Sequence, residues 1–116
     1  MYNPSHKDTA CLLNIIDAIE KIKQYSEPFQ NADELYNDSK SFDAVMMNFV
    51  VVGEMADKLS EDFKDSTESQ INWFKIRGLR NIIAHNYFGV DAEEVWQIIE
   101  DSLLDLGIIV SEILES

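Results

Sequence analysis

The chain has 116 residues and carries 22 Asp and Glu against 9 Lys and Arg, which gives a formal net charge of −13. This length predicts a single domain over residues 1–116, and the charge excludes a general nucleic-acid coat protein, because phosphate backbones are bound mainly through accumulated Lys and Arg. One cysteine, no apolar leader and no apolar run of membrane length predict a cytoplasmic protein without membrane contact.

Apolar residues recur at helical spacing along the chain, so the sequence predicts an all-α fold. The first helix is expected from about Ser5 to Ser26, because the residue before Pro28 avoids α geometry. The segment Asn31-Ala-Asp-Glu34 is typical of a capping box. It predicts a short second helix that closes at Asn37-Asp38-Ser39.

The second half of the chain is also expected to be helical. A long helix from about Ser41 to Ser60 places Gly53 on its apolar face, where another helix can approach closely. Residues 61–69 are polar and break the periodicity, which resumes from Ile71 to about Asn86. A capping box at Asp91-Ala-Glu-Glu94 opens the last helix. Its apolar seam comprises Trp96, Ile99, Leu103, Leu106, Val110 and Ile113. The pattern predicts a bundle of four long helices plus a short one.

A window without acidic residues extends from Ser69 to Val90, in a chain that is otherwise rich in acids. It contains both arginines of the chain, Arg77 and Arg80, and one of its two histidines, His85. Permanently charged guanidinium groups in such a window predict a site for an anion, and phosphate is the first candidate.

The positions of these residues on an ideal helix bear on how they work together. Arg77, Asn81 and His85 would form one ridge, with Arg80 and Tyr87 on a second ridge beside it. Arg80 and His85 would then lie about 140° apart, so one helix alone does not join them. Either a distortion of the helix or a twofold dimer could do so. We favour the dimer, because it would place four arginines and two histidines in one cleft.

Such a cleft suits cleavage of RNA by transfer of the phosphodiester to a 2′-hydroxyl. Histidine side chains titrate near neutrality, so His85 could act as general acid or base. Arg77 and Arg80 could grip phosphate oxygens as negative charge develops, and Asn81 could orient the histidine or the phosphate. No cofactor and no metal is expected, because the window lacks carboxylates for Mg²⁺ and one histidine per chain is not a zinc site.

Simpler interpretations compete with this one. A histidine near a helix C-terminus is often a cap, and two arginines three residues apart are often surface solvation. Trp73, Phe74 and Phe88 could stack on unpaired bases, but packing in the core or at an interface is favoured for all three, while Tyr87 is evenly balanced. The residues expected to have no chemical role are a solvated His6, a core-filling Cys11 and an exposed Glu54.

The string Arg80-Asn81, then His85, Tyr87 and Phe88-Gly-Val-Asp91, resembles the motif of the HEPN superfamily, and specifically of HepT-like ribonuclease toxins. Residues 43–54, which end in Gly-Glu, resemble that family's second long helix, and the resemblance covers essentially the whole chain. It implies a HEPN-like up-and-down bundle that forms a homodimer and cleaves RNA without a metal. Arg80 and His85 carry over as the catalytic residues.

The resemblance also implies regulation. HepT-like toxins are typically paired with an antitoxin, a small MntA-like nucleotidyltransferase that attaches AMP to the motif tyrosine, here Tyr87. The adenylate would add bulk and negative charge beside the phosphate site. This chain departs from the pattern at Met47, near which many relatives carry an arginine, so its cleft is expected to be less basic. Two alternatives remain, namely a non-catalytic HEPN domain that binds nucleotide as the partner of a nucleotidyltransferase, and a purely structural helical dimer.

Overall fold

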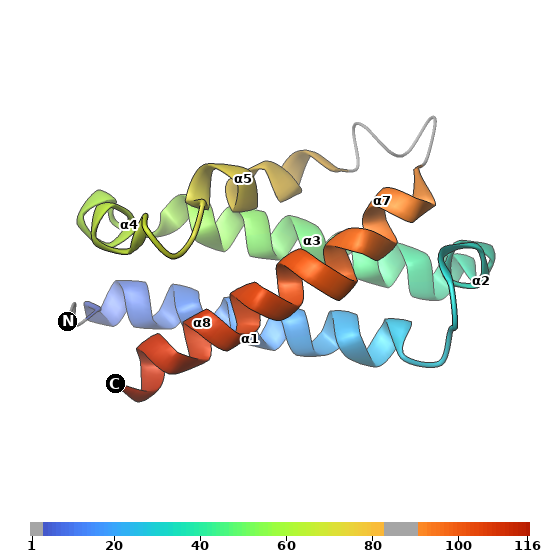
Figure 1. Cartoon of the computed structure of the whole chain (residues 1–116), viewed down its shortest axis with the longest axis horizontal. Coiled ribbons are helices and arrows are strands. Elements are labelled where there is room, and N and C mark those ends of the chain that lie inside the picture. Colours follow the sequence, from blue (N-terminus) through green and yellow to red (C-terminus); the bar gives the residue numbers. More distant parts are fainter. Residues whose placement is uncertain (1–3, 83–90) are drawn as a thin grey trace.

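The structure is a computed structural model that describes residues 4–82 and 91–116, and these residues form an all-α bundle, as predicted (Figure 1). The long helix α3 (Ser39–Lys58) lies in the middle, with α1 (His6–Ser26) packed along one side of it. The short helix α5 (Trp73–Arg77) packs along another side of α3. The last helix, α8 (Leu103–Glu115), crosses over α1.

The N-terminal half confirms the predicted elements closely. The first helix, α1, begins one residue after its N-cap Ser5, and the short α2 (Ala32–Asn37) follows its N-cap Asn31. Each cap side chain accepts a hydrogen bond from a backbone N–H of the first turn, which satisfies a donor that the helix itself leaves unpaired.

The core lies where α3 meets α1. Along α3 the buried side chains recur at three- and four-residue steps, which keeps them on one side of the helix. Each large apolar side chain that is fully buried contributes about 1.5–3 kcal/mol relative to an exposed one. The largest of those with almost no exposed surface include Phe49, Phe63, Leu12, Ile15, Ile19 and Ile22.

A helix that the sequence did not predict, α4, spans Glu61–Thr67. Its residues show no apolar periodicity because seven residues make barely two turns, and Phe63 is the large apolar side chain that they bury. The N-cap is Ser60, whose side chain accepts from the Phe63 N–H. A buried carboxylate on α1, Asp8, accepts from both the N–H and the hydroxyl of Ser60 at 2.8 and 2.7 Å, which ties α4 to α1.

The helix predicted from Ile71 to Asn86 is not a continuous α-helix in its described part. After α5 the chain tightens into the 3-10 helix η1 (Gly78–Asn81), and Ile82 is the last described residue before position 91. Side chains three residues apart eclipse each other in 3-10 geometry, so the ideal α-helical positions expected for this segment do not hold.

The last predicted helix is interrupted as well. It comprises α7 (Ala92–Gln97), a π-helical segment η2 (Ile98–Ser102) and α8. The wider π turn shifts the face that points inward, so Val95 is fully buried, while Trp96 and Ile99 of the predicted seam are partly buried and pack against the core. From Leu103 onward the predicted seam is buried, through Leu106 and Val110. None of the helices in residues 4–82 and 91–116 is long and apolar enough to cross a bilayer.

Candidate functional site

The side chain of Arg80 extends from η1 across the surface of α3. Its Nη1 lies 3.0 Å from Asp57 Oδ2 and 3.8 Å from Glu54 Oε1. The two acids are three residues apart on α3, so they lie on the same side of that helix. The Arg80 side chain is 32% exposed, so this ion pair remains open to solvent and to a ligand.

Arg77 reaches the same carboxylate from the end of α5. Its Nη1 lies 3.7 Å from Asp57 Oδ1, and its guanidinium carbon lies 5.1 Å from the centroid of the Phe74 ring. Arg77 and Arg80 are three residues apart, and the tightening of the chain at η1 directs both toward α3. The two arginines therefore share one carboxylate, Asp57.

Gly53 makes this arrangement possible. A Cβ atom added there would overlap the backbone N of Arg80, and it would lie 2.8 Å from Arg80 Cβ and 3.0 Å from the carbonyl O of Arg77. The predicted close approach at Gly53 is confirmed, and the segment that approaches is the one that carries both arginines. Glycine brings Arg80 within reach of the acids on the next turn of α3.

The acid-free window is free of acids in sequence but not in space. Glu54 and Asp57 come from α3, outside the window, and they partly neutralise the positive charge that the window was expected to offer an anion. Glu54, expected to be only an exposed acid, is half-buried and contacts Arg80. Two acids on one helical turn just after Gly53 were the signal in the sequence that both could pair with an arginine on the approaching segment.

The other predicted site residues divide into two groups. Asn81 is exposed at the end of η1, beside Arg80 in sequence. His85 and Tyr87 lie outside the described residues, as does Phe88, so the joining of Arg80 and His85 in a dimer stays a prediction. Met47, near which many members of the resembled family carry an arginine, is 59% exposed on α3.

The aromatic residues before Arg77 differ in their placement. Trp73 is buried against Phe63, and its Nε1–H donates to Thr67 Oγ1 at 2.8 Å, so its predicted packing in the core is confirmed. Phe74 is 77% exposed, so the prediction that it packs in the core of its own chain is wrong, and packing at an interface stays a prediction. Phe74 remains available at the surface beside Arg77.

Cys11 and His6 lie where the sequence placed them, one in the core and one in solvent. Cys11 is buried in the core, where burial and then the negative charge of Asp8 raise the pKa of its thiol. A buried thiol that stays protonated is a poor nucleophile. His6 is exposed at the start of α1. Over residues 4–82 and 91–116, no group of three or more His, Cys, Asp or Glu side chains is placed to hold a metal ion.

Comparisons with known proteins agree with the resemblance. The sequence profile of the family "Ribonuclease HepT-like" matches residues 15–113. A Thermococcus cleftensis protein named "Probable ribonuclease HepT" is 31% identical over 102 residues, which cover 88% of this chain and 89% of that protein. A Methanocaldococcus jannaschii protein named "Putative RNase" is 30% identical over 96 residues, which cover 83% and 78%.

A further Methanocaldococcus jannaschii protein, whose name joins a gamma-glutamylcyclotransferase to an RNase, is 27% identical over 110 residues. That match covers 94% of this chain but 49% of the relative. No solved structure gives a significant match. The profile spans most of the chain and the Thermococcus relative aligns over nearly its full length, so this chain belongs to the HepT-like ribonuclease family of the HEPN superfamily.

Proposed function

We propose that this protein is an endoribonuclease that cleaves RNA at a site built on Arg80. The observation that supports the proposal most directly is the placement of Arg80 at the surface of α3, paired with Asp57 and Glu54, in a chain of the HepT-like ribonuclease family. A guanidinium held by carboxylates is already oriented before RNA arrives. It can exchange those carboxylates for phosphate oxygens with little rearrangement.

In the proposed reaction the 2′-oxygen attacks the adjacent phosphorus, and the bond from phosphorus to the 5′-oxygen breaks. His85 takes the proton from the 2′-hydroxyl, and a protonated His85 returns a proton to the departing 5′-oxygen. Arg80 stabilises the charge that develops on the non-bridging oxygens, while Arg77 and Asn81 help to hold the phosphate. The products are a 2′,3′-cyclic phosphate and a 5′-hydroxyl, and no step requires a metal.

The proposed active form is a homodimer. Arg80 belongs to η1, and its side chain lies across the surface of α3. A second copy placed against this side would bring two Arg80 and two His85 side chains to one cleft. The exposed Met47 on the same helix gives that face an apolar contact of the kind that dimers bury. One His85 could then act as base while the partner's His85 acts as acid.

We further propose that the protein is the toxin of a toxin–antitoxin pair. The support for this part is the resemblance of the motif to that of HepT-like toxins, whose MntA-like partner modifies the motif tyrosine. Tyr87 would be the residue that receives AMP, two positions after His85. An adenylate there would compete with the RNA phosphate for Arg80 and Arg77 by its own negative charge.

The experiment that tests the proposal compares the protein with its Arg80→Ala and His85→Ala variants on single-stranded RNA in EDTA. The protein is first treated with a phosphodiesterase and shown by mass to be free of AMP. We expect the wild-type protein to release ends with a 2′,3′-cyclic phosphate, and each variant to lose about 10²-fold or more of the rate.

The alternatives give different results. Equal cleavage by the wild-type protein and the His85→Ala variant would mean that a contaminating nuclease acts. No cleavage by AMP-free, folded protein would contradict the proposal and favour the non-catalytic nucleotide-binding partner. Incubation of the Tyr87→Phe variant with an MntA-like nucleotidyltransferase and ATP checks the modification, because only the wild-type protein should gain the mass of AMP.

A further inference from the structure

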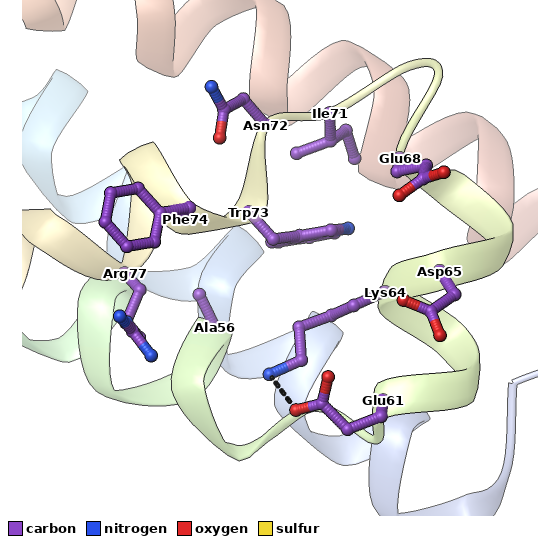
Figure 2. Close-up of a pocket in the computed structure, with 10 residues that line it drawn as sticks. All are labelled: Ala56, Glu61, Lys64, Asp65, Glu68, Ile71, Asn72, Trp73, Phe74 and Arg77. Carbon is purple, nitrogen blue, oxygen red and sulfur yellow. Dashed lines mark ion pairs between the residues drawn. The ribbon is translucent and has the colours of Figure 1, made fainter.

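A pocket of about 420 Å³ opens between α4 and α5, directly beside the arginine pair (Figure 2). We call it the α4–α5 pocket. Phe74 and Arg77 lie on one side of it, and the acids of α4 and of its C-cap, Glu68, lie on the opposite side. Buried Trp73 lies between them as part of the wall. The residues that line the pocket include Trp73, Phe74, Arg77, Glu61, Asp65 and Glu68.

The Phe74 side of the pocket has the form of a stacking surface. Phe74 has the largest exposed fraction, 77%, among the large hydrophobic side chains of the described residues. The guanidinium of Arg77 lies 5.1 Å from the ring centroid, so a planar cation and an aromatic ring are adjacent at the pocket edge. Aromatic rings and guanidinium planes are the surfaces on which unpaired bases stack in RNA-binding proteins.

The opposite side selects against phosphate. Glu61, Asp65 and Glu68 line it, and Lys64 is engaged by Glu61 at 3.2 Å. These carboxylates repel a phosphate group, but they accept hydrogen bonds from the amino groups of nucleobases. An RNA strand would therefore place a base in this pocket and keep its phosphate on the side of the arginines.

The pocket adjoins the site of the proposed reaction through Arg77. Arg77 lines the pocket and lies 3.7 Å from Asp57, whose other oxygen lies 3.0 Å from Arg80. A strand whose phosphate reaches Arg80 can thus insert a flanking base beside Phe74.

We propose that the α4–α5 pocket binds an unpaired nucleobase next to the cleaved phosphate, stacked on Phe74, and favours a base with an exocyclic amino group over uracil. The inference rests on the proposed ribonuclease function and adds a specificity site to it. Guanine, adenine and cytosine each offer an amino donor to the carboxylates of α4. Uracil has no amino group, and its N3–H donor is flanked by two carbonyl oxygens, which carboxylates repel.

The first experiment measures cleavage of RNA oligonucleotides that carry an abasic nucleotide at successive positions around the mapped cut. For the wild-type protein, one flanking abasic position should lower the specificity constant by about 5- to 150-fold, the range for loss of one stacked base. The Phe74→Leu variant should show a similar loss on the intact oligonucleotide and no further loss on the abasic one. Tyr25→Leu, an exposed aromatic on α1, is the matched control and should behave as wild type.

The second experiment tests base preference and binding without cleavage. An oligonucleotide with a 2′-deoxy nucleotide at the cut cannot react, so its fluorescence anisotropy reports binding even if the chain proves not to be a nuclease. At the sensitive position guanine, adenine and cytosine should bind more tightly than uracil, and Glu68→Gln together with Asp65→Asn should reduce that difference.

Two results would overturn the inference while leaving the ribonuclease intact. One is an equal penalty for Phe74→Leu on intact and abasic RNA. Another is loss of the dimer in Phe74→Leu by light scattering, because Phe74 would then belong to an interface between copies. Absence of cleavage with retained base-dependent binding would instead reject the catalytic function and support the pocket.

Discussion

Asp57 of α3 binds two arginines at once, with Arg80 at 3.0 Å on one carboxylate oxygen and Arg77 at 3.7 Å on the other. The pair is partly exposed, so its net contribution to stability is small, of order 0–1 kcal/mol. The ion pair matters more for ligand binding than for stability, because any phosphate that binds Arg80 must compete with Asp57. Asp57 therefore orients the arginines and, in the proposed function, would weaken their binding of RNA at the same time.

The first prediction concerns that competition. Asp57→Asn removes one negative charge within about 4 Å of the expected phosphate, and the Coulomb energy of such a pair in water is about 1 kcal/mol, or about fivefold in affinity. We expect uncleavable RNA to bind about fivefold more tightly. The single-turnover rate should fall, because the released arginines are no longer held in one geometry. Anisotropy at fixed ionic strength and quenched-flow cleavage measure the two effects.

Asp43→Asn is the matched control, since Asp43 is an exposed acid on the same helix and its substitution changes the net charge equally. It should alter affinity much less than Asp57→Asn. If both variants tighten binding alike, overall charge rather than the ion pair governs RNA binding.

The second prediction concerns the shape of the cation. Arg80→Lys keeps the charge but loses the planar fork that can bind two phosphate oxygens. Loss of one charge-assisted hydrogen bond costs about 1.5–3 kcal/mol, so cleavage should slow by about 10- to 150-fold. Arg77→Lys should slow it less, because Arg77 lies farther from the shared carboxylate. Equal losses in the two variants would mean that the two arginines have equivalent roles.

The third prediction concerns Gly53, where a Cβ atom has no room beside Arg80. Gly53→Ala must displace η1, and overpacking of this kind costs about 1–3 kcal/mol in the free energy of unfolding. Cleavage should fall further than the lost stability explains, because Arg80 moves away from Glu54 and Asp57. Urea denaturation and cleavage of the folded variant separate the two losses.

Gly78→Ala is the control for that substitution. A Cβ atom at Gly78 meets nothing within 4 Å, and its φ of −61° suits any residue. Alanine there should stabilise the fold by about 0.4–1 kcal/mol by restricting the unfolded chain. Equal destabilisation by both substitutions would contradict the prediction that Gly53 is needed for the close approach of Arg80.

The sequence predicted local structure well and contacts between distant segments poorly. Ser5 and Asn31 are visible as helix caps because their hydrogen bonds connect residues three apart. The pairing of Arg80 with Asp57 joins segments that meet only after folding. Hydrophobic periodicity does not predict which surface charges will meet. The change from α5 to η1 was likewise hidden, because α and 3-10 turns share nearly the same apolar spacing over so few residues.

The fourth prediction concerns Asp8, which is buried on α1 and accepts two hydrogen bonds from Ser60 at the start of α4. Asp8→Ala leaves the part-buried N–H of Ser60 without its acceptor, so the free energy of unfolding should fall by about 1–3 kcal/mol in urea denaturation. Asp17→Ala, which removes an exposed acid from the same helix, should change it by less than 0.5 kcal/mol. Because α4 forms the acidic side of the α4–α5 pocket, Asp8→Ala should also weaken base-dependent RNA binding, whereas Asp17→Ala should not. Unchanged stability in Asp8→Ala would show that α4 is held by Phe63 and its apolar neighbours rather than by this carboxylate.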